Sequence, residues 1–478
     1  MVFLLSLRMG SLVSLRGALA ALLCLLLVQL GDHAQAKNLG STPKLRASAA
    51  QGAPAKSASR GTQAARKPQA TRTKKARPAP PAPAPLRDGQ AEERLLQVLE
   101  LTRQGQTRDA LTQAERLVRD YPNFQLAQLA LGDLLAARAR PLQQPGDVPS
   151  ALHAEARTTL LELRTELQRR VEARGARPGQ QKVPSQFLEL APRYRHAIAV
   201  DASRSRLYLF ENTPQGLRLV ADYYASVGKL GIEKTVEGDQ RTPLGVYFIT
   251  SRLDPATLRD FYGAGALPLN YPNPLDQLRG KTGSGIWLHG TPPDQFSRAP
   301  LATDGCVALA NPDLERLLRT VEPRTTPVVI ARQLDWVAPQ SVQAEHKAFE
   351  AVLDGWRNAK TAGDMQRLMA FYAPDFQGQR KTTLAQWATA LHAETQALGG
   401  REIELKDKAI LRWTDSMDTM VVTFGEVASG SRTGPVKRQF WARRGKHWQI
   451  IYEGVIGSFP EEIPLWRLPA LPQQLLFL

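Results

Sequence analysis

The chain has 478 residues, too many for one ordinary domain, so we expect two to four domains. Its 43% of hydrophobic residues and eight tryptophans are enough to build folded cores. The formal net charge of +17 lies largely in one segment, because no acidic residue occurs between Lys37 and Arg87. The charge is therefore mainly that of a tail, and we expect no nucleic-acid partner.

Residues 1–36 have the features of a secretory signal peptide. Arg8 and Arg16 precede an apolar run from Ala18 to Leu30, and Ala34-Gln35-Ala36 supplies a small-x-small cleavage site. A retained membrane anchor is the competing interpretation, but the run is shorter than the roughly 20 apolar residues that a spanning helix needs. We therefore expect cleavage and export to the periplasm or cell envelope.

Removal of this segment would leave Cys306 as the one thiol of the mature chain, because the other cysteine is Cys24. Thiols usually pair in exported compartments, so an unpaired cysteine there is a liability unless it is used. The alternative, a small buried apolar residue, is common for free cysteine. The flanking Asp304 and Gly305 favour a loop over a core strand.

Residues 37–90 form a basic, Ala/Pro-rich linker that ends in the run Pro78–Pro85. Almost none of its apolar residues is larger than alanine, so the linker cannot bury a core and should be disordered. Its charge suits an electrostatic tether to anionic envelope polymers. A solvated spacer is an equal alternative.

Residues 91–180 change to a helical period. Apolar residues recur at three- and four-residue spacing, among them Leu95, Leu96, Leu99, Ala110, Leu111, Ala114, Leu117 and Val118. The order Gly105, Ala110-Leu111, Ala114, Tyr121-Pro122, Ala127, Leu131-Gly132 resembles a tetratricopeptide repeat. Hardly more than one repeat is covered, whereas such arrays need three or more for stability. We expect a helical cap on the next domain, and an independent surface for a protein partner stays open.

Residues 190–337 switch to short β-type runs, which predicts a mainly-β domain with few helices. The expected strands cover 196–200, 206–210, 217–221, 245–249, 285–289 and 327–330. A hairpin connection at 212–216 separates the second and third strands. One helix is well signalled, with Asn311 as its cap and Pro312 at its first position.

Residues 342–457 combine helical segments with later strand-like runs, which predicts an α+β unit. Helices are expected at 349–356 and 368–372, and strands at 403–405, 419–424, 439–442 and 448–452. This order resembles the cone-shaped nuclear-transport-factor-like (SnoaL-like) fold, whose members often keep a pocket. No cluster of titratable residues is evident in this segment. Residues 458–478 remain as a C-terminal tail.

Cys306 and His289 are the candidates for catalysis. A free thiol is mostly protonated at neutral pH, and an adjacent histidine makes it a nucleophile. His289 ends an apolar run, and the Gly305-Cys306 loop offers N–H donors for an oxyanion and close substrate approach. Either Asp304 or a backbone carbonyl would orient the His289 ring.

Three other interpretations compete with catalysis at this pair. One cysteine and one histidine leave two zinc ligands to be found, so no metal site is expected. A redox-sensing thiol usually has a resolving cysteine as well. A buried structural pair is the third alternative.

Three motifs stand out in this region. They are His289-Gly290-Thr291 followed by Thr303-Asp304-Gly305-Cys306-Val307, the earlier run Gly238–Tyr247, and the loop Asn270-Tyr271-Pro272-Asn273 with Asp276. Together they resemble the L,D-transpeptidase (YkuD-like) catalytic domain. The resemblance covers residues 194–332, roughly a third of the chain.

The resemblance implies peptidoglycan chemistry in a bacterial envelope, in wall crosslinking, remodelling and cell shape. Cys306 would be the nucleophile and His289 the general base and acid, and neither a metal nor an organic cofactor is needed. The implied loop-supporting and substrate-contacting residues are Gly305, Asp304 and Gly290, and then Asn270, Tyr271 and Thr303. The thiol would attack the third residue of a tetrapeptide stem, a diamino acid, and expel D-alanine before an amine or water takes the acyl group.

The chain departs from the family pattern at two positions. The family commonly has a histidine before the Gly-Cys pair, where this chain has Asp304. It also commonly has an arginine two positions after the cysteine, where this chain has Ala308. That arginine is associated with recognition of a substrate carboxylate, so the acceptor stays open. The alternatives are a hydrolytic relative (an L,D-carboxypeptidase or a wall-protein detaching amidase) and a non-catalytic wall-binding scaffold.

Overall fold

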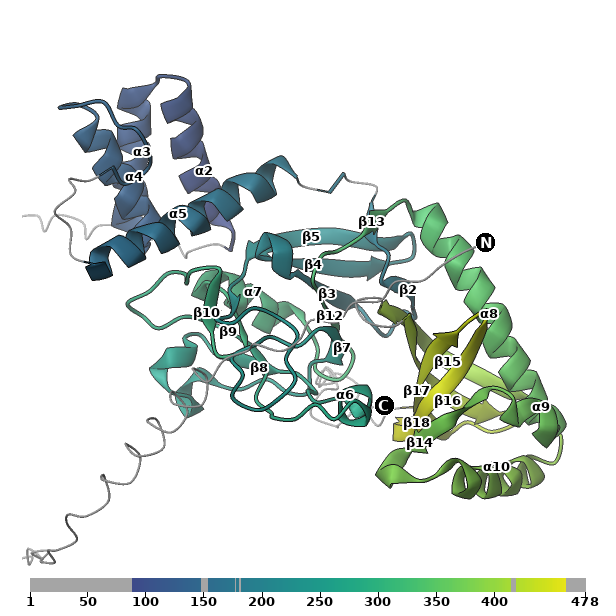
Figure 1. Cartoon of the computed structure of the whole chain (residues 1–478). Helices are drawn as coiled ribbons and strands as arrows, with labels where there is room; N and C mark the ends of the chain where they lie inside the picture. The colour runs from purple at the N-terminus through teal and green to yellow at the C-terminus, as the bar shows by residue number, and fades with distance from the viewer. Residues whose placement is uncertain (1–87, 148–153, 177, 180–181, 414–417, 461–478) are drawn as a thin grey trace, which may run out of the picture. The chain divides into compact units, whose positions relative to one another are not determined.

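The computed structural model describes residues 88–147, 154–176, 178–179, 182–413 and 418–460 (Figure 1). The predicted signal peptide, nearly all of the basic linker and most of the C-terminal tail lie outside these residues. A helical region, a mostly-β domain and an α+β domain follow one another along the chain, which confirms the predicted fold class. No helix in the described part combines the length and apolarity that a membrane span requires.

Four helices form the first region of the described chain. They are α2 (Gln90–Arg103), α3 (Thr107–Asp120), α4 (Gln125–Ala136) and α5 (Ala154–Gly175). The apolar spacing of the sequence puts Leu95, Ala110, Ala114 and Leu117 on the faces where α2, α3 and α4 meet, and all four are buried. Burial of these faces is the main source of stability for such short helices.

Five strands form the main sheet of the second domain, in the order β5-β4-β3-β12-β7. Their bounds are β3 (His196–Asp201), β4 (Arg206–Thr213), β5 (Gly216–Tyr224), β7 (Gly245–Phe248) and β12 (Pro327–Ala331). The first three form an antiparallel meander, and β12 lies parallel to β3 and antiparallel to β7. The central strands are covered on both faces, so Ile198, Leu209 and Val329 are fully buried.

Smaller sheets carry the candidate catalytic residues. Their strands are β6 (Val227–Gly228), β8 (Ala266–Pro268), β9 (Trp287–His289), β10 (Leu301–Thr303) and β11 (Val307–Ala308). The strand β9 lies between β8 and β11, and β10 pairs with β6. The helical elements of this domain are η1 (Ala202–Arg204), η2 (Pro255–Thr257), η3 (Asp260–Tyr262), α6 (Pro274–Leu278) and α7 (Asn311–Thr320).

The helical region packs on the second domain through buried ion pairs. Arg170 of α5 lies 2.6 Å from Glu166 and 2.9 Å from Glu92 of α2. Glu92 also pairs with Arg206 of β4 at 2.8 Å. Asp313 of α7 accepts a hydrogen bond of 2.7 Å from the backbone N–H ahead of α2. These contacts join the four helices to the mostly-β domain as a cap.

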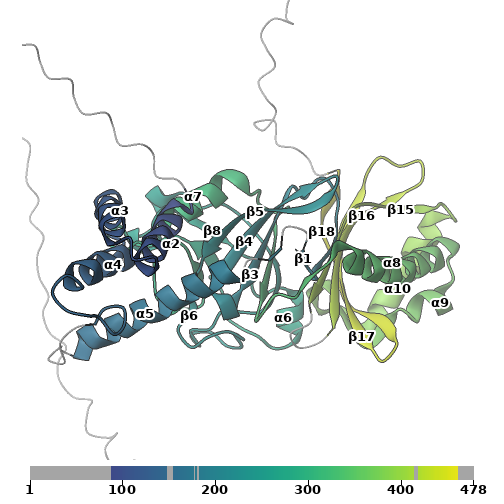
Figure 2. The same cartoon turned by 90° about the horizontal axis from the view of Figure 1, so that it is seen from above.

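The third domain is a six-stranded sheet in the order β14-β18-β17-β16-β15-β2, with α8 and α10 on one face (Figure 2). The strands are β2 (Phe187–Leu190), β14 (Tyr372–Gly378), β15 (Ile403–Trp413), β16 (Thr419–Ala428), β17 (Gly434–Arg444) and β18 (His447–Phe459). The remaining elements are α8 (Pro339–Ala362), α9 (Met365–Met369), η4 (Gln379–Lys381), α10 (Leu384–Leu398) and the paired strands β1 (Val183–Pro184) and β13 (Trp336–Val337). The helix expected at 368–372 ends at Met369, because Tyr372 already begins β14.

The two faces of this sheet belong to different cores. Successive side chains of a strand point to opposite faces. Phe440 and Ala442 of β17 therefore pack into the core of the mostly-β domain, whereas Trp441 packs with Phe349 and Trp356 of α8. The sheet thus joins the second domain to the helices of the third.

A buried charge cluster lies on the helical side of the sheet, where the sequence showed no clustered titratable set. Lys360 and Lys437 each contact Glu394 and Glu426, at N–O distances of 2.7–3.3 Å. Lys437 also lies 3.5 Å from the fully buried Glu453. The expectation was wrong because these residues come from five separate elements, and only the fold brings them together.

Candidate active site

The strands β9 and β11 bring the two candidate catalytic residues to one face of a sheet. The strands run parallel, with Leu288 opposite Val307 and His289 opposite Ala308. Continued by one residue, this register puts Cys306 opposite Trp287. Side chains two positions apart on a strand share a face. Cys306 directly precedes β11, so by this register its side chain would lie on the same face as that of His289.

The His289 ring is buried and held in one orientation. Its side chain is only 1% exposed, and its Nδ1 lies 2.7 Å from the carbonyl oxygen of Gly290. Because a carbonyl can only accept, Nδ1 carries the proton and Nε2 is the free acceptor. Of the two orienting groups that the sequence left open, the backbone carbonyl is the one that contacts the ring.

Burial makes His289 a neutral base. The pKa of the imidazole is lowered to about 4, mainly by desolvation and also by the charge of Arg298, while the bond to Gly290 opposes this shift. Two aromatic rings of η3 flank the imidazole: Tyr262 lies edge-on with ring centroids 5.2 Å apart, and Phe261 lies at 5.9 Å. A neutral imidazole held by carbonyl and aromatic contacts can accept a proton from a thiol.

The Cys306 thiol is half-buried and donates to the carbonyl oxygen of Gly285 at 3.2 Å. Burial raises the pKa of this thiol to about 11, and the Asp304 carboxylate also raises it. The backbone N–H of Trp287 and the charge of Arg298 act in the opposite direction. The resting pair is therefore a neutral thiol and a neutral imidazole, and a thiol in this state would have to lose its proton to act as a nucleophile.

The loop before Cys306 is braced by threonines. Thr303 Oγ1 donates to the Cys306 carbonyl at 2.7 Å and accepts from Gly305 N–H at 3.2 Å. Thr242 Oγ1 donates to the Gly305 carbonyl at 2.9 Å, so the Gly238–Tyr247 motif supports the nucleophile loop directly. Thr303, predicted to contact substrate, is 2% exposed and bonds within the loop.

The position of Gly305 requires a glycine, because it leaves no room for a Cβ atom. Its φ is +124°, and a Cβ atom there would lie 2.8 Å from the Arg241 carbonyl oxygen. Its N–H is already shared with Thr303, so an oxyanion at this position would compete with that bond. Asp304, its neighbour, is exposed and lies 3.1 Å from both Lys229 Nζ and Gln240 Nε2. Asp304 therefore links the loop to the segment after β6 and does not orient His289.

Gly290 lies against the side-chain amide of Asn311, a residue that the sequence analysis predicted to be a helix cap. Asn311 Oδ1 accepts from Ala264 N at 2.9 Å and Thr291 N at 3.1 Å, and Nδ2 donates to the Thr291 carbonyl at 2.9 Å. A Cβ at Gly290 would lie 2.1 Å from Oδ1. Asn311 was predicted to cap α7, but Ala310 holds that position and makes no side-chain cap bond. The amide instead fixes the strand end that carries His289.

Asn270 and Tyr271, the other predicted substrate contacts, bond within the domain. Asn270 Oδ1 accepts from Phe248 N at 2.7 Å. The Tyr271 side chain is buried, and its hydroxyl donates to the Thr282 carbonyl at 3.1 Å. Their contact with a substrate stays a prediction.

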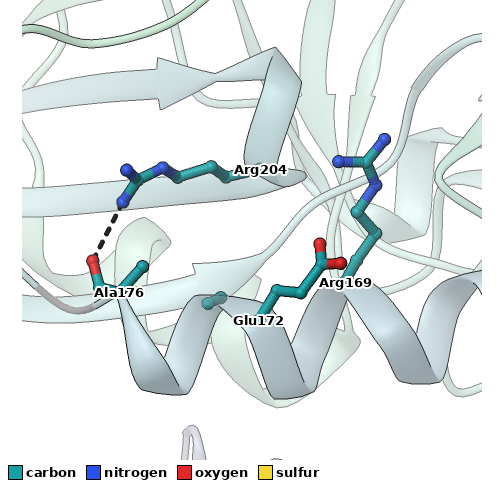
Figure 3. Close-up of a pocket in the computed structure, with 5 residues that line it drawn as sticks. Arg169, Glu172, Ala176 and Arg204 are labelled. Carbon is teal, nitrogen blue, oxygen red and sulfur yellow. Dashed lines mark hydrogen bonds between the residues drawn. The ribbon is translucent and has the colours of Figure 1, made fainter.

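A hollow of about 220 Å³ lies elsewhere, between α5 and the turn after β3 (Figure 3). It is lined by Arg169, Glu172, Ala173, Ala176 and Arg204. Arg204 donates to the Ala176 carbonyl at 2.9 Å, and Arg169 bonds the Ser203 carbonyl. These guanidinium groups already have backbone partners, and none of the lining residues belongs to the Cys306 site.

Among the described residues, one group of side chains has ligand atoms close enough to share a metal ion. It consists of Glu189, His346 and Glu350. His346 Nε2 lies 2.8 Å from Glu189, and the Lys408 ammonium lies 3.2 Å from Glu189 and 2.5 Å from Glu350. The lysine supplies the positive charge that these carboxylates need, so the group is an ion-pair network.

Comparisons with known proteins agree with this architecture. Residues 195–330 match the family model of the L,D-transpeptidase catalytic domain (YkuD), and residues 348–454 match that of the Cds6 C-terminal NTF2-like domain. The chain therefore contains an L,D-transpeptidase catalytic domain followed by an NTF2-like domain. No curated protein matches the chain by sequence.

Two solved structures resemble the chain over more than half of its length. Bd1075 from Bdellovibrio bacteriovorus is 24% identical, with 57% of this chain and 98% of that chain covered and a TM-score of 0.50. The helical cell shape determining protein Pgp2 from Campylobacter jejuni is 21% identical, with coverage of 60% and 99% and a TM-score of 0.46. The likeness to Bd1075 shows a shared fold.

Proposed function

We propose that the chain is an exported cysteine L,D-transpeptidase that acts on peptidoglycan stem peptides in the bacterial cell envelope. The YkuD family acts on such peptides. The observation that carries the proposal is the parallel pairing of β9, which ends in His289, with β11, which Cys306 directly precedes, together with the His289 tautomer set by Gly290. A thiol with a neutral imidazole base is the minimum apparatus for acyl transfer through a thioester.

The first half of the reaction forms the acyl-enzyme. As the Cys306 sulfur attacks the carbonyl carbon of the third stem residue, its proton moves to His289 Nε2. The tetrahedral intermediate then collapses, and the bond to the terminal D-alanine breaks. His289 returns the proton to the departing amine, so the ring is neutral again when the thioester has formed.

The second half of the reaction transfers the acyl group. An amine from a second stem or a protein attacks the thioester, and His289 Nε2 accepts the amine proton. Collapse forms the new amide and releases the Cys306 thiolate, to which His289 returns the proton to give the thiol. Transfer to a second stem gives a crosslink between two third residues.

Water is the second candidate acceptor. Asp304 and Ala308 occupy the positions at which L,D-transpeptidases commonly have a histidine and an arginine. Asp304 bonds to Lys229 and Gln240, so the side chain before the Gly-Cys pair supplies no second imidazole beside the thioester. With water as the acceptor, the products would be a tripeptide stem or, from a wall-linked donor, a released protein.

Analysis of muropeptides by mass spectrometry tests the proposal. The full-length protein would be incubated with tetrapeptide-containing wall fragments, and free D-alanine, tripeptides and dimers would be measured together with the intact mass of the protein. We expect D-alanine release and a tripeptide adduct on the wild type. Dimers identify an amine acceptor, and tripeptides without dimers identify water.

The matched variants are Cys306→Ala, His289→Ala and Ser203→Ala. The first two should lose both the adduct and D-alanine release while the protein stays folded, as judged by circular dichroism. Ser203, on the turn after β3, should tolerate its substitution with full activity. If the wild type formed no adduct and released no D-alanine, both the transferase and the hydrolase would be ruled out, and the wall-binding scaffold would remain.

A further inference from the structure

The segment between His289 and Cys306 contains one positively charged residue, Arg298, which has no role in the proposed mechanism. Its guanidinium carbon lies 4.2 Å from the centroid of the Phe261 ring, and that ring lies 5.9 Å from the His289 ring. The charge of Arg298 lowers the pKa of both His289 and Cys306. Arg298 therefore packs on the aromatic ring that lies next to His289, and its charge acts on both candidate reacting groups.

Arg298 is half-buried, and no carboxylate of the described residues forms an ion pair with it. Its Nε atom is buried and has no hydrogen-bond partner among the described residues. Asp304 is the acidic side chain that acts on its charge, but the Asp304 carboxylate is held by Lys229 and Gln240. Buried cationic groups are normally paired. A carboxylate brought by a ligand would complete this site.

The backbone around Arg298 is fixed before any ligand arrives. The Tyr224 hydroxyl donates to the Arg298 carbonyl at 2.8 Å, and Ser226 Oγ donates to the Ala299 carbonyl at 2.6 Å. On the other side, Ser297 Oγ donates to Glu166 of α5 at 2.7 Å. Such preorganisation reduces the entropy lost when a ligand binds.

We propose that Arg298 binds the carboxylate of the leaving D-alanine and so selects donor stems with a free C-terminus. This inference rests on the proposed function. The carboxylate lies one residue beyond the attacked carbonyl, and one residue of extended chain spans at most about 3.3–3.6 Å. The guanidinium group packs on Phe261, the ring next to His289, so Arg298 is the cation of this segment that such a carboxylate would meet. The planar guanidinium can form two parallel bonds to a carboxylate, which a lysine cannot reproduce.

The competing interpretation is that Arg298 only packs against Phe261. Arginine side chains cover aromatic rings with their apolar stems as well as with their charge. An Arg298→Met variant separates the two roles, because methionine keeps an unbranched apolar chain over the ring and removes the charge. Arg298→Lys keeps the charge and removes the planar fork.

The test measures binding to full-length protein that carries Cys306→Ala, so that no turnover occurs. Isothermal titration calorimetry would use the stem tetrapeptide and the same peptide with its terminal D-alanine as the amide. We expect the acid to bind at least tenfold more tightly than the amide. Adding Arg298→Met should abolish this preference by weakening the acid alone, and Arg298→Lys should restore part of it. Adding Arg204→Met, in the hollow of Figure 3, should leave the preference unchanged.

Each other outcome rejects the proposal. A preference for the acid that survives Arg298→Met would assign the carboxylate to another residue. Equal weakening of both peptides would place Arg298 at a different carboxylate of the stem. In either case D-alanine release by the wild type would leave the proposed function intact. If the Cys306→Ala protein bound neither peptide and the wild type released no D-alanine, the stem peptide itself would be the wrong substrate.

Discussion

His289 Nδ1 lies 2.7 Å from the carbonyl oxygen of Gly290, the residue that follows it in the chain. The bond commits Nδ1 to donation and leaves Nε2 as the proton acceptor of the ring. With burial lowering the pKa of His289 to about 4 and raising that of Cys306 to about 11, the pair rests uncharged. In the proposed mechanism His289 would therefore act as a general base, because the two groups do not form a thiolate–imidazolium ion pair at rest.

Alkylation of Cys306 by iodoacetamide should therefore accelerate about tenfold per pH unit between pH 7 and 10. Only the thiolate reacts, and its fraction rises tenfold per unit until the pH nears the pKa of about 11. Mass spectrometry of the Cys306 peptide would follow the rate and exclude reaction at Cys24, with Cys306→Ser as the control. A rate that levels off below pH 8 would show a preformed ion pair and contradict this reading of the site.

Gly305→Ala should reduce kcat/KM on the order of 100-fold, the cost of displacing a reacting group by about 1 Å. The added Cβ would meet the Arg241 carbonyl oxygen at 2.8 Å and push Cys306 out of register. Gly216→Ala is the matched control, because φ there is +107° but nothing lies within 4 Å of the added Cβ. It should cost about 1–2 kcal/mol of stability and leave activity unchanged. Equal activity in the two variants would show that the Arg241 contact is unimportant.

The sequence predicted the fold because each domain has its own periodicity. The spacing of Leu95 and Leu117 is helical, and the runs at 196–200 and 327–330 are short and apolar enough for buried strands. Cys306 and His289 could be selected from residue chemistry alone. The spatial arrangement of these two residues could not be predicted, because the parallel register of β9 and β11 depends on tertiary pairing.

The contacts that the sequence analysis missed join residues that lie far apart in the chain. Arg298 meets Phe261, which is 37 positions away, and Thr242 meets Gly305 across 63 positions. Nothing near either residue in the sequence signals its partner. Arg298 could have been singled out as the only charged residue besides Asp294 between Gly290 and Thr303. The contact that gives it a role still had to come from the structure.

Ser297→Ala should lower kcat/KM on the order of tenfold, because the helical region holds the Arg298 connection through this hydroxyl. The lost bond is one of 2.7 Å to the buried Glu166 carboxylate, and bonds to charged groups contribute about 1.5–3 kcal/mol. Ser203→Ala removes a bond of the same 2.7 Å length to Asp201 and should change stability alone. Steady-state kinetics and thermal denaturation of both variants decide the matter. Unchanged kinetics in Ser297→Ala would show that α5 has no influence on the site.

Lys437→Met should destabilise the NTF2-like domain by about 3–5 kcal/mol, as expected when one partner of a buried ion-pair network is removed. The Lys437 side chain is 2% exposed, and Glu426 and Glu453 would be left with less compensating charge. Lys446→Met, on the exposed turn between β17 and β18, should have little effect. Urea denaturation followed by tryptophan fluorescence measures both. Similar midpoints for the two variants would show that the cluster contributes no net stability.

Asp313→Asn should stabilise the protein at pH 8 and have little effect near pH 4. Burial raises the pKa of Asp313 to about 7, above the value of roughly 3.9 expected when unfolded. Between these values the folded state binds the proton more tightly, so stability falls as the pH rises towards 7 and the loss is complete above it. Asparagine keeps an acceptor for Gly89 N–H and never ionises, which should recover on the order of 2–4 kcal/mol at pH 8.

Asp239→Asn, the comparison variant, should instead destabilise the protein at neutral pH. Lys234 and backbone N–H groups lower the pKa of Asp239 to about 2, so its charge stabilises the fold there. Denaturation midpoints at pH 4, 6 and 8 would test both, and an Asp313→Asn effect that does not grow with pH would mean that Asp313 stays charged in the folded protein.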